Sequence, residues 1–168
     1  KKLFQVSHLA GKLNKTYGHS LRHELLSRRD EIQRDTVFHH TYGDRHNIED
    51  ARMGKIDVFS PSQFGVAIEN TQHRGYFTEK ILDLFLLKSV PIYWGCTNIG
   101  YFFNTDGIIT VNSVDDIIHA INVLDKNSYD IVFKKAVEEN YQTAKKYVDY
   151  EQNIVDYITK VFTENGIL

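Results

Sequence analysis

The sequence is poor in the residues that cross-link a chain, break its regular structure or anchor it in a membrane. Its 168 residues include one cysteine, Cys96, two prolines and one tryptophan. A single cysteine excludes the internal disulfide framework of small secreted domains. The longest purely apolar run, residues 84–87, is far too short to cross a bilayer. The first residues show no signal-peptide pattern, and a chain that opens at Lys1 rather than methionine is expected to be a fragment.

An excess of charge of one sign is also missing. Twenty Lys and Arg oppose 22 Asp and Glu, which gives a formal net charge of −2 and argues against a nucleic-acid partner. Hydrophobic residues make up 42% of the chain and charged residues 25%, values typical of a globular domain rather than a disordered one. We therefore expect residues 1–168 to form a single domain of a cytoplasmic protein, with attachment to a membrane surface as the alternative.

Strand and helix patterns alternate along the chain. Apolar runs predict strands at 3–8, 36–38, 64–68, 90–94 and 108–111. Helices are predicted from Ser20 to about Gln33 and from Thr78 through Lys88, with one helical turn at 49–53. Three amphipathic helices should make up a helical C-terminal tail over 113–168, with apolar sets at 114–124, 129–144 and 154–162. This order predicts an α/β fold, a Rossmann-like parallel sheet with helices on both faces.

In an open parallel sheet, ligands bind beyond the carboxyl ends of the strands. The loop leading to Arg22, the loop 70–80 and the turn at Gly95 all follow predicted strands, so we expect them to converge. Arg22 and Lys80 each fall in the first turn of a predicted helix, where the macrodipole disfavours a cation by ~0.3–1 kcal/mol. Helix N-termini attract anions, so one interpretation is a diphosphate held between these two cations. The other interpretation is a pair of solvated surface cations.

Two runs of residues resemble a known signature. Residues 68–72 (IENTQ) and 75–81 (GYFTEKI) are similar to the donor-site signature of the α1,3/4-fucosyltransferases, glycosyltransferase family 10, which reads roughly F-E-N-[ST], a spacer and Y-[VF]-T-E-K-[IL]. Residues 90–95 (VPIYWG) resemble the V-P-[VI]-Y-W-G segment of the same family. The resemblance is specific from about residue 64 to 111, is closest to bacterial members, and is weaker around Arg22.

The resemblance implies the C-terminal, donor-binding half of a GT-B glycosyltransferase. The enzyme would use GDP-fucose as donor substrate, invert the anomeric centre, and need neither a cofactor nor a metal. Arg22 and Lys80 would neutralise the diphosphate, and Glu79 would bind ribose hydroxyls. Asn70 and Tyr76 would contact the ribose, the phosphates or the fucose. The glycan acceptor site and the general base would belong to an N-terminal domain or a partner chain, so no catalytic base is expected among these residues.

Other functions stay open at this point. The chain could be a non-catalytic subunit that binds a nucleotide sugar or supports assembly, or a transferase for another nucleotide sugar. The E-x7-E pattern of many retaining GT-B enzymes is absent, because Glu69 and Glu79 are ten positions apart. The D-x-D triplet of metal-dependent transferases is absent as well. His19 and His23 have an i, i+4 spacing that can bind zinc, but the chain has no H-E-x-x-H motif, so we expect no metal site.

Overall fold

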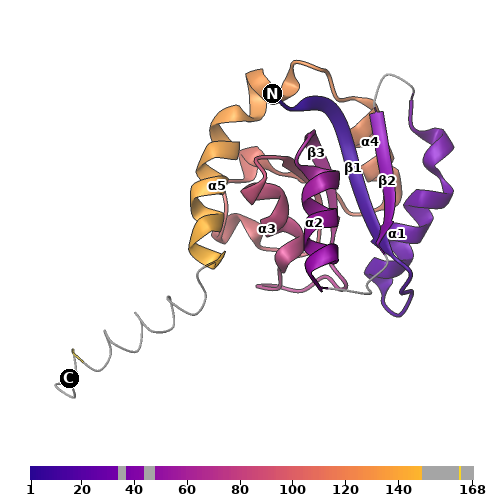
Figure 1. Cartoon of the computed structure of the whole chain (residues 1–168), viewed down its shortest axis with the longest axis horizontal. Helices are drawn as coiled ribbons and strands as arrows, with labels where there is room; N and C mark the ends of the chain where they lie inside the picture. The colour runs from indigo at the N-terminus through magenta and orange to yellow at the C-terminus, as the bar shows by residue number, and fades with distance from the viewer. Residues whose placement is uncertain (34–36, 44–47, 149–162, 164–168) are drawn as a thin grey trace.

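The computed structural model describes residues 1–33, 37–43, 48–148 and 163. Its centre is a five-stranded sheet in the order β2-β1-β3-β4-β5 (Figure 1). The strands are β1 (Leu3–Gly11), β2 (Val37–Gly43), β3 (Ser62–Ile68), β4 (Val90–Trp94) and β5 (Ile109–Thr110), and every neighbouring pair is parallel. All carboxyl ends of the strands therefore lie at the same edge.

Helices cover both faces of this sheet (Figure 1). They are α1 (Tyr17–Ser27), α2 (Ile48–Phe59), α3 (Glu79–Leu86), α4 (Val114–Asn122) and α5 (Lys134–Val148). Alternate residues of β3 face opposite cores, as the twofold period of a strand requires. Phe64 and Val66 belong to the core shared with α1 and α4, and Ala67 belongs to the core shared with α2 and α3. The predicted α/β, Rossmann-like architecture is confirmed.

Several elements are longer than their sequence patterns predict. β1 continues to Gly11 and β2 to Gly43, where a polar loop was expected from Thr41, because the two strands pair in register through Gly11 and Gly43. Helix α2 has 12 residues where only a turn at 49–53 was predicted, and its last turn buries Val58 and Phe59. Tertiary pairing and burial override weak local propensity in both places. The predicted apolar set at 154–162 lies outside the described residues.

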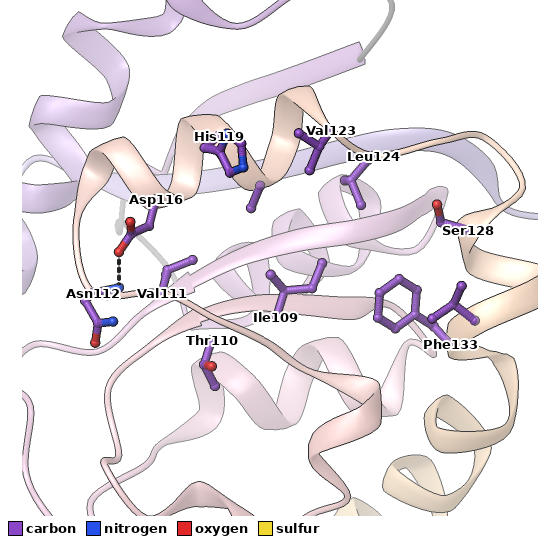
Figure 2. Close-up of a pocket in the computed structure, with 12 residues that line it drawn as sticks. Ile109, Thr110, Val111, Asn112, Asp116, His119, Val123, Leu124, Ser128 and Phe133 are labelled. Carbon is purple, nitrogen blue, oxygen red and sulfur yellow. Dashed lines mark hydrogen bonds between the residues drawn. The ribbon is translucent and has the colours of Figure 1, made fainter.

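A pocket of about 580 Å³ opens at the edge strand β5, between that strand, helix α4 and residues 128–133 (Figure 2). Its lining is largely apolar, with Asp116 and His119 on the helix side. The Asp116 carboxylate already accepts the Asn112 backbone N–H at 2.9 Å. None of the five residues predicted to bind the donor lines this pocket. In the part of the chain that the structure describes, no helix is both long and apolar enough to cross a bilayer.

Candidate functional site

Three chain segments meet at the carboxyl edge of the sheet. The Gly18 N–H of α1 donates to the Asn70 carbonyl at 3.0 Å, and the Glu69 N–H donates to the Trp94 carbonyl at 2.9 Å. A Cβ on Gly18 would lie 1.7 Å from the Glu69 carbonyl oxygen, and a Cβ on Gly95 would lie 2.5 Å from Glu69 Cγ. Only glycine fits at either position. The predicted convergence of these three segments is confirmed.

The predicted position of Arg22 in a first helical turn is wrong. Thr16 is the N-cap of α1, since its Oγ1 accepts the His19 N–H at 3.3 Å, and the helix begins at Tyr17. Arg22 therefore lies in the second turn. Ser20, which resembled a cap in the sequence, is inside the helix instead, and its N–H donates to the Thr16 carbonyl at 3.1 Å.

Arg22 instead ties α1 to the end of β3. Its side chain is buried, and Nε and Nη2 donate to the Ile68 carbonyl at 3.1 and 2.7 Å. Nη2 also donates to Asn70 Oδ1 at 2.8 Å, which fixes the orientation of that amide. The structure thus brings two of the predicted site residues, Arg22 and Asn70, into direct contact.

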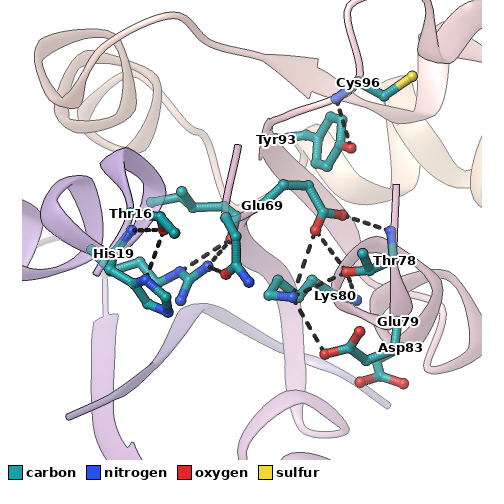
Figure 3. A network of polar contacts seen from close by, with 12 residues as sticks. Thr16, His19, Glu69, Thr78, Glu79, Lys80, Asp83, Tyr93 and Cys96 are labelled. Atoms are coloured by element: carbon teal, nitrogen blue, oxygen red, sulfur yellow. Dashed lines mark hydrogen bonds and ion pairs between the residues drawn. The ribbon is translucent and has the colours of Figure 1, made fainter. Parts of the chain in front are cut away.

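Lys80 lies in the first turn of α3, as the sequence predicts. Thr78 caps this helix and Glu79 is its first residue. The Lys80 ammonium is 3.1 Å from Thr78 Oγ1, 3.4 Å from Glu79 Oε1 and 3.6 Å from Glu69 Oε2 (Figure 3). This cation is therefore held among three oxygen-bearing side chains at the start of the helix.

Glu69 is a residue of this site that the sequence interpretation missed. It is fully buried, directly after β3. Its Oε1 accepts the Thr78 N–H at 2.9 Å, and its Oε2 accepts the Thr78 O–H at 2.6 Å (Figure 3). The sequence signal for this residue is its place directly after the predicted apolar strand 64–68, because a carboxylate that is buried there must be paired; the sequence does not indicate the partner.

Tyr76 is placed by a turn just before α3. Gly75 has a φ of 74°, a conformation that favours glycine, and its N–H donates to Asn98 Oδ1 at 2.7 Å. Burial raises the pKa of the Tyr76 hydroxyl, the charges of Glu69 and Glu79 raise it further, and the charge of Arg22 opposes them. Tyr76 therefore lies within electrostatic reach of both carboxylates and of Arg22, and it is available as a protonated O–H donor.

Glu79 is flanked by two cations. Lys55, on α2, has its ammonium 3.6 Å from Glu79 Oε1 and 2.8 Å from Asp83 Oδ2. Burial raises the pKa of the Glu79 carboxyl, but the positive charges of Lys80 and Lys55, together with hydrogen bonds from the Thr78 side chain and the backbone, hold the pKa below its ordinary value. Glu79 is thus an ionised acceptor at the surface of the site.

Replacing Lys55 by methionine is expected to raise the pKa of Glu79, measured as an NMR titration of its carboxyl carbon. The Glu79 pKa is lower in the folded state than the unfolded value of 4.5, so ionised Glu79 stabilises the fold at pH values above 4.5. This stabilisation is lost as the pH falls through the folded pKa. In Lys55→Met the folded pKa moves closer to 4.5, so the pH range over which the stabilisation is lost becomes narrower. The matched control is Lys135→Met, which removes a lysine that is 92% exposed and on a different helix. An unchanged Glu79 pKa in Lys55→Met would contradict the assignment.

A family model for glycosyltransferase family 10 (fucosyltransferase), C-terminal part, matches residues 19–132. The chain belongs to this family. It is 34% identical over 80 residues to an alpha-(1,3)-fucosyltransferase of Helicobacter pylori, a match that covers 45% of this chain and 17% of that protein. It is 31% identical over 94 residues to the bovine 4-galactosyl-N-acetylglucosaminide 3-alpha-L-fucosyltransferase 9, covering 53% of this chain and 26% of that protein.

Solved structures show the same fold. The chain superimposes on an alpha1,3-fucosyltransferase crystallised with GDP-fucose, with a TM-score of 0.58 and 24% identity over 92% of this chain and 47% of that one. An alpha1,3-fucosyltransferase structure without a named ligand gives a TM-score of 0.57 over 93% of this chain and 46% of that one. The chain thus spans less than half the length of the relatives it matches. The resemblance to family 10 in the sequence motifs is confirmed.

Proposed function

We propose that the chain is the donor-binding half of a fucosyltransferase and holds GDP-fucose at the carboxyl edge of its sheet. The proposal rests on one observation: the family-10 motif places a cation, Lys80, in the first turn of α3, beside the converging ends of β3 and β4. A helix N-terminus with a cation beside it suits a diphosphate. The GDP-fucose found with a structural neighbour supports the same ligand for this site.

Each predicted donor residue has a role in this proposal. Lys80 and the first turn of α3 bind the diphosphate, and Lys80 gives up its loose 3.4 Å contact with Glu79 to do so. Glu79 is then free to accept hydroxyl groups of the ribose. Asn70 and Tyr76 contact the ribose, the phosphates or the fucose. Arg22 contributes positive charge and holds the Asn70 amide in place.

The chemistry proposed for these groups is stabilisation of the leaving group. When the bond between fucose and phosphate breaks, negative charge grows on GDP and positive charge on the sugar ring. A fixed cation aimed at the diphosphate stabilises that transition state more than the ground state. Transfer would invert the anomeric centre, with the acceptor hydroxyl attacking the face opposite GDP, and charge neutralisation by the protein replaces a metal.

A general base must reach the acceptor hydroxyl directly or through one water. We propose that this base and the glycan acceptor site belong to an N-terminal domain or partner chain, with residues 1–168 acting as one donor domain, including the helical segment from residue 113. A cytoplasmic location is part of the same proposal.

Calorimetric titration with GDP, GDP-fucose, GDP-mannose and UDP-sugars tests donor binding, and a transfer assay with an added N-terminal domain tests the chemistry. We expect GDP and GDP-fucose to bind, and fucose transfer to appear when the second domain is present. Binding without turnover in the presence of that domain would show that the chain is a non-catalytic subunit that binds a nucleotide sugar. Tighter binding of another nucleotide sugar would show that this sugar, and not GDP-fucose, is the donor. Absence of any nucleotide binding would overturn the proposal.

A further inference from the structure

A chain of hydrogen bonds with a single direction leads from Lys80 through Thr78 to Glu69, directly after β3. The Thr78 hydroxyl donates its one proton to Glu69 Oε2 at 2.6 Å. Its oxygen is left as an acceptor, and Lys80 Nζ donates to it at 3.1 Å. The backbone N–H of Thr78 donates to the other oxygen of Glu69 at 2.9 Å, so one carboxylate fixes both polar groups of Thr78 (Figure 3).

The direction of these bonds is set by Glu69. Glu69 accepts the Thr78 O–H, and the Lys80 ammonium can only donate, so a Thr78 lone pair must face Lys80. The short O–H to carboxylate bond is of the strong, charge-assisted kind. Glu69 itself cannot move easily, because it is fully buried and lies against Gly95, where even one added methyl group would be 2.5 Å from its Cγ.

A lysine side chain left to itself samples many rotamers, and ordering it on a ligand costs binding free energy. We propose that Glu69 and Thr78 are positioning residues that hold the Lys80 ammonium in place for a diphosphate before the nucleotide arrives. This inference rests on the proposed function and adds to it, since neither residue needs to touch the donor.

Thr78→Val is the variant that isolates the hydroxyl, because it keeps the size and the charge of the site. We expect the Kd for GDP to rise about tenfold, the loss of one hydrogen bond to a charged group. The Kd for guanosine, which has no phosphate, should not change. Thr78→Ser restores the hydroxyl and should bring GDP binding back to the wild-type value.

The control for a purely structural effect is Ser113→Ala. Ser113 caps α4, where its Oγ accepts the Asp116 N–H at 3.1 Å, so this variant also loses a side-chain helix cap. Its GDP affinity should equal that of the wild type. If Thr78→Val binds GDP as tightly as the wild type, or loses GDP and guanosine equally, the positioning role is wrong while the donor site stands. If the wild type binds no GDP, the proposed function is wrong, and the failure lies there rather than in the roles of Glu69 and Thr78.

One measurement tests the inference without any ligand. In the ligand-free protein, the NMR signal of the Lys80 ammonium should be protected from exchange with water, and this protection should be lost in Thr78→Val. A double-mutant cycle tests whether the two residues act as one unit. Adding Thr78→Val to Glu69→Gln should change the GDP Kd less than Thr78→Val does alone; fully additive effects, or an unprotected wild-type ammonium, would overturn the inference.

Discussion

Gly18→Ala should destabilise the fold by about 3 kcal/mol or more, the upper end for overpacking. The added methyl group would lie 1.7 Å from the Glu69 carbonyl oxygen, 2.8 Å from the Glu69 carbonyl carbon and 2.9 Å from the Asn70 carbonyl oxygen. These are backbone atoms of the two residues that directly follow β3, so no side chain can rotate away to make room. Helix α1 must then move off β3, and the bonds from Arg22 to Ile68 and Asn70 break with it.

Urea unfolding followed by tryptophan fluorescence measures this loss. Trp94 is the only tryptophan, and its ring centroid is 5.6 Å from that of Tyr17 at the start of α1, so it reports on the affected junction. Gly54→Ala is the matched control, because Gly54 lies within α2 and has open space around its Cβ position. The control should gain about 0.5–1 kcal/mol from the better helix propensity of alanine. Equal stability of Gly18→Ala and wild type would contradict the close approach of α1 to β3.

Lys80→Met should weaken GDP binding by one to two orders of magnitude. A hydrogen bond to a charged group contributes roughly 1.5–3 kcal/mol, and each ~1.4 kcal/mol is tenfold in Kd. The variant also leaves the buried Glu69 without its cationic neighbour at 3.6 Å, so the remaining charge near the phosphates becomes more negative. Both effects act against a diphosphate and have little influence on a nucleoside.

Calorimetry with GDP and with guanosine on the same protein measures the selective loss. Lys135→Met makes the same change in net charge at a site that is 92% exposed, and it should bind GDP as the wild type does. The salt dependence of GDP binding should decrease in Lys80→Met, since one charged contact is gone. If both variants bind GDP like the wild type, Lys80 is not a phosphate ligand.

The part of the site formed by consecutive residues could be predicted from the sequence. Thr78, Glu79 and Lys80 are a cap and a first turn, and local rules place them correctly. Arg22 was misplaced because the segment contains two residues that favour an N-cap, Thr16 and Ser20, and local rules do not choose between them. Thr16 caps α1 in the structure, and the Gly18 N–H of the same turn makes a long-range contact with the Asn70 carbonyl.

Glu69 shows a second limit of sequence reasoning. Its neighbours in the chain, Ile68 and Asn70, do not reveal that its carboxylate turns inward to Thr78, nine positions later. Sheet pairing likewise decided the length of β2, whose polar residues favour a loop when read alone. Local rules thus place the residues of a single helical turn correctly, whereas the contacts that support them join distant segments and are not predicted from the sequence.

A crystal structure of the chain with GDP tests most directly whether a nucleoside diphosphate binds at the start of α3. We expect phosphate oxygens within hydrogen-bonding distance of the Lys80 ammonium, with the ribose beside Glu79. GDP bound instead in the pocket beside β5, with Lys80 still turned toward Glu69 and Glu79, would contradict it.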